Sequence, residues 1–202
     1  MAEKPGLSNS LIHLRILTHI FRVNLMLVAA RFVSIIKVIT RLLALVVLTG
    51  VACVHAEGKI NAPEFTLNTL DEERQISLSD YRGKVIYLDF WASWCGPCRK
   101  SLPMLNELRN ELRDRGFEVL ALNIDETREE GLRFLKEYPV DYPTLFDNEG
   151  TAATYQLRGM PTAFLIDHNG KLHSQHVGFN PKDMGSIREE VLSLLEAAES
   201  AR

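Results

Sequence analysis

The sequence predicts an α/β domain with a central mixed β-sheet flanked by helices. Short apolar runs rich in β-forming residues alternate with segments whose apolar residues recur at helical spacing, and this alternation is typical of a sheet covered by helices. One hairpin pattern before the alternating region and another after it add antiparallel strands, so the sheet should be mixed. Apolar residues make up 46% of the 202 residues, which is enough for a packed core.

The first half of the domain begins with a predicted β-hairpin around the polar turn Asp71–Glu73. The continuous apolar runs 85–91 and 118–124 predict two buried strands. Between them, the segment 97–115 carries leucines at helical spacing, and Gly116 ends the predicted helix. The two hairpin strands are centred on Phe65–Leu67 and Ile76–Leu78.

The second half continues the alternation and closes on a hairpin and a helix. Asp167-His168-Asn169-Gly170 is a turn sequence, so the strands on either side of it should pair antiparallel. Asn180 is a suitable N-cap for the last helix, with Pro181 at its first position. The other predicted elements are a helix at 128–137, a short strand at 144–146, a helical turn at 152–155 and strands at 162–166 and 171–177.

Residues 1–56 have the pattern of a targeting segment. Basic residues up to Arg41 precede an uncharged apolar run, and Val54-His55-Ala56 resembles the small-residue site at which signal peptides are cleaved. We interpret residues 1–56 as a signal peptide or N-terminal membrane anchor, 57–63 as a linker and 64–202 as the folded domain. The protein is therefore expected to be exported, either periplasmic or membrane-anchored and facing the periplasm. Lipid attachment at Cys53 and a true start at Met26 are alternatives within this segment.

The remaining chain is acidic. Six of the 23 Lys and Arg residues and one of the 26 Asp and Glu residues lie within residues 1–56. The residues after position 56 thus hold 17 basic and 25 acidic side chains, a net charge of −8. Nucleic-acid binding requires a basic surface, so a domain this acidic is a poor candidate for it and we expect no nucleic-acid partner.

The chain contains three cysteines, Cys53, Cys95 and Cys98, and cleavage of the targeting segment would leave the last two. Structural disulfides mostly close long loops, so a pair separated by two residues favours redox chemistry. A metal site would need two more ligands at matching spacing, and no second cysteine pair is present. We expect no metal and no cofactor besides the cysteine pair, and surface positions for His168, His173 and His176.

The sequence Trp94-Cys95-Gly96-Pro97-Cys98 follows a predicted strand and opens a predicted helix. Unpaired backbone N–H groups and the positive end of the helix dipole would stabilise a thiolate there and lower the pKa of the Cys95 thiol. Cys95 is then the expected nucleophile, which attacks a partner disulfide to form a mixed disulfide. Cys98, one turn into the helix, is expected to resolve that bond.

Asp89 and Pro161, near the cysteine pair, can each be interpreted in two ways, either as part of the reaction chemistry or as purely structural residues. Asp89 lies in an apolar strand, where burial would raise the pKa of its carboxyl and let it take the proton of Cys98. It could equally be a strand-end acid whose oxygens accept backbone hydrogen bonds. Pro161 either marks the start of a strand or follows a cis peptide bond, and the local sequence leaves both open.

The segment from Asp89 to Cys98 resembles the active-site segment of the thioredoxin superfamily, and the rest of the domain resembles its TlpA/ResA branch of exported thiol–disulfide oxidoreductases. The lead-in Ala62-Pro63-Glu64-Phe65-Thr66-Leu67 with its hairpin is similar to that of the branch, as is the turn Asp167–Lys171. The distance between Cys98 and Pro161 matches the strand and helix that the branch inserts. The resemblance implies a thioredoxin fold with an N-terminal β-hairpin and an inserted strand–helix unit.

The resemblance also implies roles for single residues. Cys95 would attack and Cys98 resolve, Asp89 would be the buried acid, and Pro161 would be a cis proline beside the pair. Glu126 stands where some ResA-like proteins keep an auxiliary acid. The substrate-contact surface would comprise Trp94, Gly96, Pro97, Gly159 and Met160.

The sequence departs from the branch at Ser101, where ResA-like proteins place Glu, and this weakens the case for cytochrome c maturation. Gly96-Pro97 is the dipeptide of reducing thioredoxins, which favours a reductase. We therefore expect a monomeric reductase of disulfides in exported proteins, such as apocytochromes or copper-site proteins, supplied with electrons by a membrane thiol carrier.

Two other functions compete with this expectation. Peroxiredoxins share the lead-in, but their Pro-x-x-x-Thr-x-x-Cys pattern is absent before Cys95. Rapid peroxide consumption would favour a peroxiredoxin-like peroxidase. A copper-binding metallochaperone could use both thiolates and Met160. Tight Cu(I) binding without disulfide turnover would favour that role.

Overall fold

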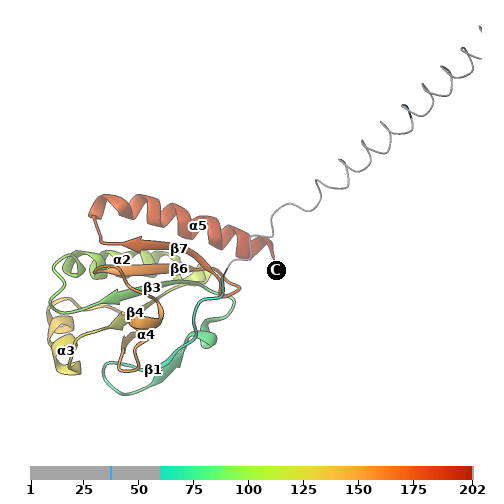
Figure 1. Cartoon of the computed structure of the whole chain (residues 1–202). Helices are drawn as coiled ribbons and strands as arrows, with labels where there is room; N and C mark the ends of the chain where they lie inside the picture. The colour runs from blue at the N-terminus through green and yellow to red at the C-terminus, as the bar shows by residue number, and fades with distance from the viewer. Residues whose placement is uncertain (1–36, 38–59, 202) are drawn as a thin grey trace, which may run out of the picture. The chain divides into compact units, whose positions relative to one another are not determined.

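The computed structural model describes Lys37 and residues 60–201, and the folded unit begins at Gly58 (Figure 1). The expected targeting segment, with the alternatives at Cys53 and Met26, therefore lies outside the described residues except for Lys37. Only residues 60–63 of the expected linker are described. Within the described part of the chain, no helix combines the length and apolar character needed to cross a membrane.

A five-stranded mixed sheet forms the centre of the domain, as the sequence predicts. Its strand order is β5-β4-β3-β6-β7. β3 pairs parallel with β4, which pairs parallel with β5, whereas β6 runs antiparallel to both β3 and β7. The strands are β3 (Val85–Trp91), β4 (Phe117–Asn123), β5 (Thr144–Phe146), β6 (Thr162–Ile166) and β7 (Leu172–Val177).

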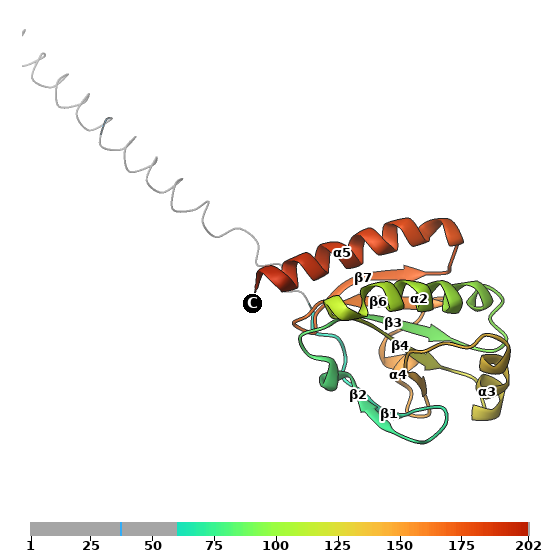
Figure 2. The ribbon, with the colours of Figure 1, turned by 180° about the vertical axis from the view of Figure 1, so that it is seen from behind.

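Helices cover one face of the sheet. Figure 2 shows α2 (Cys98–Leu112) and α5 (Met184–Ser200) side by side above it. The leucines of α2, the apolar stripe of α5 and Phe134 of α3 (Arg128–Glu137) form one buried cluster with Val85, Tyr87 and Trp91 of β3. This cluster contains both cysteines of the pair, so the same apolar packing that stabilises the helices also surrounds the sulfur atoms.

The opposite face is covered by the N-terminal lead-in. The hairpin of β1 (Thr66–Asn68) and β2 (Gln75–Ser77) and the short helix α4 (Thr151–Thr154) pack there. They enclose Ile86, Leu88 and Phe90, the residues of β3 whose side chains alternate with those on the helix face. Because β3 is covered on both faces, all seven of its residues are buried, which accounts for its nearly continuous apolar sequence.

The element boundaries differ from the predicted ones mainly at turns. α2 begins at Cys98, one residue later than predicted, because Pro97 occupies its N-cap position. The last helix is preceded by a 3₁₀ turn, η3 (Pro181–Asp183), whose N-cap Asn180 accepts a hydrogen bond from the backbone N–H of Lys182 at 3.0 Å. Two further 3₁₀ turns, which periodicity did not predict, are η1 (Leu78–Tyr81) and η2 (Arg113–Arg115).

The lead-in joins the sheet at both edges. Near β7, the backbone N–H of Leu172 donates to the carbonyl of Ile60 at 2.9 Å, and Asn61 pairs with Lys171. At the other edge, Thr69 pairs with Leu145 of β5. The first of these contacts lies at the turn between β6 and β7, which is the end of the sheet away from the cysteine pair (Figure 1).

We predict opposite stability effects for two helical glycines. A Cβ atom at Gly131 of α3 would lie 3.0 Å from the side chain of the fully buried Asn123, whereas one at Gly185 of α5 would meet no atom within 4 Å. Gly131→Ala should lower the free energy of unfolding by about 1–3 kcal/mol through overpacking. Gly185→Ala should raise it by about 0.5 kcal/mol through helix propensity. Urea unfolding of the oxidised protein measures both, and a Gly131→Ala protein as stable as the parent would contradict the predicted clash.

Candidate active site

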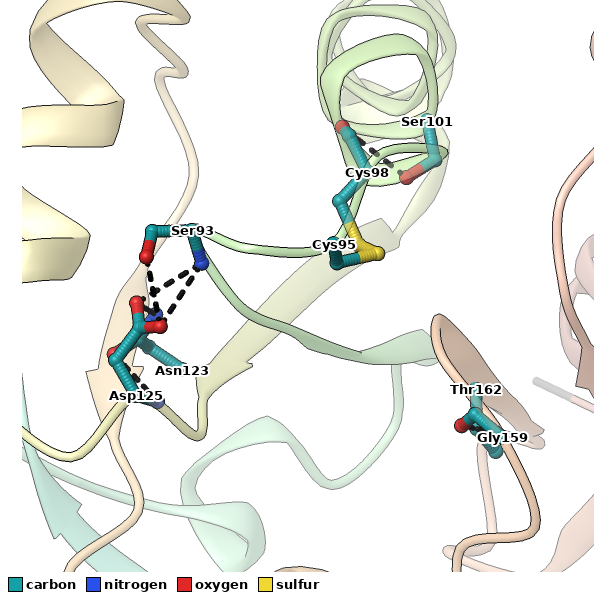
Figure 3. The surroundings of a disulfide bond; sticks show 8 residues. All are labelled: Ser93, Cys95, Cys98, Ser101, Asn123, Asp125, Gly159 and Thr162. Carbon is teal, nitrogen blue, oxygen red and sulfur yellow. Dashed lines mark hydrogen bonds between the residues drawn. A yellow bond between two sulfur atoms is a disulfide. The ribbon is translucent and has the colours of Figure 1, made fainter.

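A disulfide joins Cys95 and Cys98 at the point where the loop after β3 enters α2 (Figure 3). The Cα atoms of the two cysteines are 5.3 Å apart. Cys95 is 3% exposed and Cys98 is fully buried, so Cys95 is the more accessible of the two, in agreement with its expected role as the attacking residue.

Turn hydrogen bonds hold the pair at the start of α2. The N–H of Cys95 donates to the carbonyl of Ala92 at 3.1 Å, and the N–H of Cys98 donates to the carbonyl of Cys95 at 3.1 Å. Cys95 therefore lies at the positive end of a 15-residue helix, where a thiolate is favoured. Trp94, which is 63% exposed, and the exposed Gly96 and Pro97 form the surface around it.

The loop before β6 provides the other side of the site. The Met160–Pro161 peptide bond is cis, as the resemblance implies. The hydroxyl of Thr162 donates to the carbonyl of Gly159 at 2.8 Å, and Met160 packs against the cluster that contains both cysteines. Gly159 is exposed, so its backbone is available to an extended partner chain.

Val177 belongs to the same surface and was missed by the sequence analysis. A Cβ atom at Gly159 would lie 3.3 Å from a methyl group of Val177, so the end of β7 contacts the loop before the cis proline. Val177 is 53% exposed. With Ile60 and Trp94, it is one of three exposed large apolar side chains in the described residues. No sequence signal marks it, because an apolar residue at a strand end is common.

Asp89 is buried in β3 on the face that carries the cysteine pair. It is 2% exposed, and its Oδ2 atom has no hydrogen-bond partner. Burial raises the pKa of the Asp89 carboxyl to about 8. Of the two interpretations of this residue, the strand-end acid satisfied by backbone donors does not fit the unpartnered oxygen. The unpartnered oxygen instead fits a carboxyl that is mostly neutral at pH 7 and can exchange a proton.

The loop that carries Cys95 is held by a second acid, Asp125. Both of its carboxylate oxygens lie 3.0 Å from the backbone nitrogen of Ser93, and the hydroxyl of Ser93 donates to it at 2.9 Å (Figure 3). The side-chain amide of Asn123 donates to the same carboxylate at 2.7 Å. Asp125 is 5% exposed, so these bonds tie the end of β4 to the active-site loop in a buried setting.

The structure also places the other residues that the sequence analysis singled out. The side chain of Glu126 is exposed, and the acid that contacts the active-site loop is its neighbour Asp125. Ser101 is buried, and its hydroxyl lies 3.5 Å from the carbonyl oxygen of Cys98. His173 is exposed, as expected, whereas His176 is only partly exposed and its ring is hydrogen-bonded on both sides to Tyr87 and Glu190. Within residues 60–201, no group of three or more His, Cys, Asp or Glu side chains could hold a metal ion.

We predict that Asp89→Asn stabilises the oxidised protein in a pH-dependent manner. The ordinary pKa of an aspartate is 3.8 and that of Asp89 is about 8, so the folded state retains a proton that the unfolded chain has lost. The parent therefore loses stability as the pH rises from about 4 to 8, by up to roughly 5 kcal/mol. Asparagine does not ionise, so the variant's advantage should be small near pH 4 and largest above pH 8. Urea unfolding across this range measures the difference, and a pH-independent difference would contradict it.

We predict that Asp125 and Glu126 differ sharply when truncated. Asp125→Ala removes the acceptor for the buried Asn123 amide and for Ser93, and should cost about 3 kcal/mol of unfolding free energy. Glu126→Ala, at the adjacent exposed position, should change stability by less than about 0.5 kcal/mol. Thermal unfolding of the oxidised variants compares them, and equal effects would show that the Asp125 bonds do not hold the loop.

Comparison with known proteins agrees with this geometry. A sequence profile described as the AhpC/TSA family matches residues 59–175. The chain is 39% identical over 124 residues to the thiol-disulfide oxidoreductase ResA of Bacillus cereus, covering 60% of this chain and 70% of that protein. It is 38% identical over 125 residues to the thioredoxin-like protein YneN of Bacillus subtilis, covering 60% and 72%.

A solved structure is also similar. A thiol:disulfide interchange protein DsbE from Chlorobium tepidum matches with a TM-score of 0.65 and 43% identity, covering 68% of this chain and 96% of that one. The fold, the redox-active pair and these likenesses agree with one another. The chain belongs to the AhpC/TSA family of thioredoxin-like proteins and is a thiol–disulfide oxidoreductase related to ResA.

Proposed function

We propose that this protein reduces disulfide bonds in proteins outside the cytoplasm. The observation that carries the proposal is the placement of the Cys95–Cys98 pair at the N-terminus of α2, on the face of the sheet that holds the buried carboxyl of Asp89. An accessible thiol, a buried partner thiol and a proton acceptor are the three groups that stepwise disulfide exchange requires.

In the first step, the Cys95 thiolate attacks one sulfur of the substrate disulfide. A mixed disulfide forms between Cys95 and the substrate, and the other substrate sulfur leaves as a thiolate. Trp94 and Val177 offer apolar contacts on either side, and the exposed backbone at Gly159 offers hydrogen bonds to an extended substrate segment.

In the second step, Cys98 attacks the Cys95 sulfur. The Cys98 thiol must lose its proton to do so, and Asp89 is the acceptor in this proposal. The Cys95–Cys98 disulfide forms, the substrate leaves as a dithiol, and two electrons have passed from the enzyme to the substrate. A further thiol donor must then return two electrons to the pair.

The direction and setting of the reaction rest on the sequence and on the relatives. Gly96-Pro97 between the cysteines favours a reductase. The targeting pattern in residues 1–56 supports an exported protein, periplasmic or tethered to the membrane, with a membrane thiol carrier as donor. The names of the ResA relatives and of the DsbE-like structure support disulfide exchange, and exported proteins, apocytochromes or copper-site proteins among them, are the substrates of this proposal. The protein would act as a monomer.

The test is the equilibrium redox potential of the full chain against a glutathione buffer, with Cys95→Ser as the control that cannot form the pair. A potential near the reducing end of the superfamily, about −270 mV, is expected for a reductase. A potential near about −120 mV would reverse the direction and make the protein a disulfide donor.

The same preparation separates the competing functions. Reduction of insulin disulfides that is lost in both Cys95→Ser and Cys98→Ser is expected. Consumption of hydrogen peroxide that is faster than insulin reduction would replace the proposal by a peroxidase. Tight Cu(I) binding without any insulin reduction would replace it by a copper-delivery role.

A further inference from the structure

Asp89 lies in one row of residues that crosses three strands. In the sheet register, Asp89 of β3 is opposite Ala163 of β6, and Ala163 is opposite His176 of β7. Residues in register across neighbouring strands place their side chains on the same face, so Asp89 and His176 face the same side with only a methyl group between them. The row connects the fully enclosed carboxyl to a strand at the edge of the sheet.

Tyr87 contacts the β7 end of this row through His176, and its hydroxyl is close enough to Asp89 for that acid to raise its pKa, although no hydrogen bond joins the two. It shares the Asp89 face of β3 because the two residues are two positions apart. Its register partner on β6 is Leu165, whose partner on β7 is Ser174, yet its hydroxyl lies 3.2 Å from Nδ1 of His176. The ring therefore leans out of its own row towards the row of Asp89 and His176. Tyr87 is 2% exposed, so its hydroxyl is a polar group inside the core.

His176 lies between the buried hydroxyl of Tyr87 and the surface of the domain. Its Nε2 atom lies 3.3 Å from a carboxylate oxygen of Glu190 on α5, and the hydroxyl of Ser174 donates to the other oxygen at 2.7 Å. A carboxylate at Nε2 favours the tautomer with the proton on that nitrogen, which leaves Nδ1 as an acceptor for Tyr87. His176 and Glu190 line a surface pocket of about 260 Å³ between β7 and α5, together with Asp183 and Ser186.

We propose that Tyr87 and His176 form the route by which the proton of Asp89 reaches solvent, with Glu190 as the residue that positions the histidine. This inference rests on the proposed role of Asp89 as acceptor of the Cys98 proton. In this route a water molecule entering between the Asp89 carboxyl and the Tyr87 hydroxyl carries the proton to that hydroxyl, which passes its own proton to Nδ1 of His176. The imidazolium then releases a proton into the pocket, so Asp89 becomes a carboxylate and Tyr87 and His176 return to their neutral forms.

The electrostatics of the surroundings agree with this route. Burial raises the pKa of Tyr87 well above its ordinary value, and the nearby acids Asp89, Glu190 and Asp183 raise it further, so the hydroxyl stays protonated and acts as a relay. Burial and the charge of Asp89 likewise raise the pKa of Tyr142. The hydroxyl of Tyr142 donates instead to the carbonyl of Leu102 at 3.1 Å, so Tyr142 is not part of the route.

The test follows the resolution step directly. The reduced full chain, in a Cys53→Ser background, is mixed with the disulfide 5,5′-dithiobis(2-nitrobenzoate) in a stopped-flow instrument. The first release of nitrothiobenzoate reports attack by Cys95, and the second reports resolution by Cys98. Cys98→Ser, which gives only the first release, identifies the two phases.

Because the pKa of Asp89 is about 8, most molecules at pH 7 must lose the Asp89 proton before it can accept another. Tyr87→Phe and His176→Gln should therefore slow the second phase by roughly tenfold at pH 7, less than the ~100-fold or more expected for losing the base itself. Above pH 8 the carboxyl is already ionised, and both variants should approach the parent rate. The first phase should not change. A general loosening of the core would not produce this dependence on pH.

Matched controls remove the same groups away from the route. Tyr142→Phe deletes another buried hydroxyl near Asp89, and His173→Gln replaces the exposed histidine of the same strand. Both should resolve like the parent at pH 7. If Tyr87→Phe fails to fold, as thermal unfolding would reveal, the partly exposed His176→Gln and Glu190→Gln take its place.

Two outcomes would overturn the route, and they differ in what they say about Asp89. Parent-like resolution at pH 7 in Tyr87→Phe and His176→Gln, with slow resolution in Asp89→Asn, would refute the route alone. Parent-like resolution in Asp89→Asn would refute both the route and the proposed role of Asp89.

Discussion

The structure depends on one constraint, which is that a carboxyl group lies in the middle strand of a sheet that is covered on both faces. At that depth an ionised carboxylate is costly, so Asp89 holds its proton to a much higher pH than an aspartate in water. The surrounding apolar cluster stabilises the fold and at the same time keeps this group neutral. Stability and the protonation of Asp89 are therefore coupled in the same few residues, and the core is less stable at neutral pH than it would be with a residue that does not ionise at this position.

A second carboxylate has the opposite environment. Asp125 is nearly as well buried as Asp89 but accepts hydrogen bonds from Ser93 and Asn123. These donors satisfy the buried carboxylate oxygens, so Asp125 holds the active-site loop to the end of β4. The two acids lie on neighbouring strands or their ends and differ in partners rather than in burial, which separates a structural role from a chemical one.

Much of the fold follows from patterns along the chain. The continuous apolar runs of β3 and β4 locate these strands to within one residue, and the leucine spacing locates the start of α2 equally well, whereas α2 ends at Leu112 and the rest of the predicted helix is the 3₁₀ turn η2. The flanking Gly116 and Asn180 mark where helices end and begin. The disulfide and the burial of Asp89 follow from the same patterns, since a charged residue within an apolar run has few other places to lie.

Contacts between strands could not be predicted in this way. Asp125 and Glu126 are adjacent acids in a loop, and only the pairing of β3 with β4 shows which one faces Ser93. The register shift between Leu165 and Ile166 lies at the start of β7, whose residues alternate regularly between partly buried and exposed and are mostly polar. The contacts of His176 therefore depend on the strand pairing and on a tyrosine 89 residues away in sequence.

Because the lead-in is attached at the turn between β6 and β7, the chain enters the domain at the end opposite the cysteine pair. Residue 60 enters beside Leu172, and α5 runs from the cysteine end back towards this turn, so both ends of the described segment lie at the same pole (Figures 1 and 2). The reactive sulfur lies at the other pole, with nothing from either end of the segment beside it. A fusion partner, an affinity tag or a surface linkage at the pole of the termini would thus leave the disulfide free to meet a folded protein of any width.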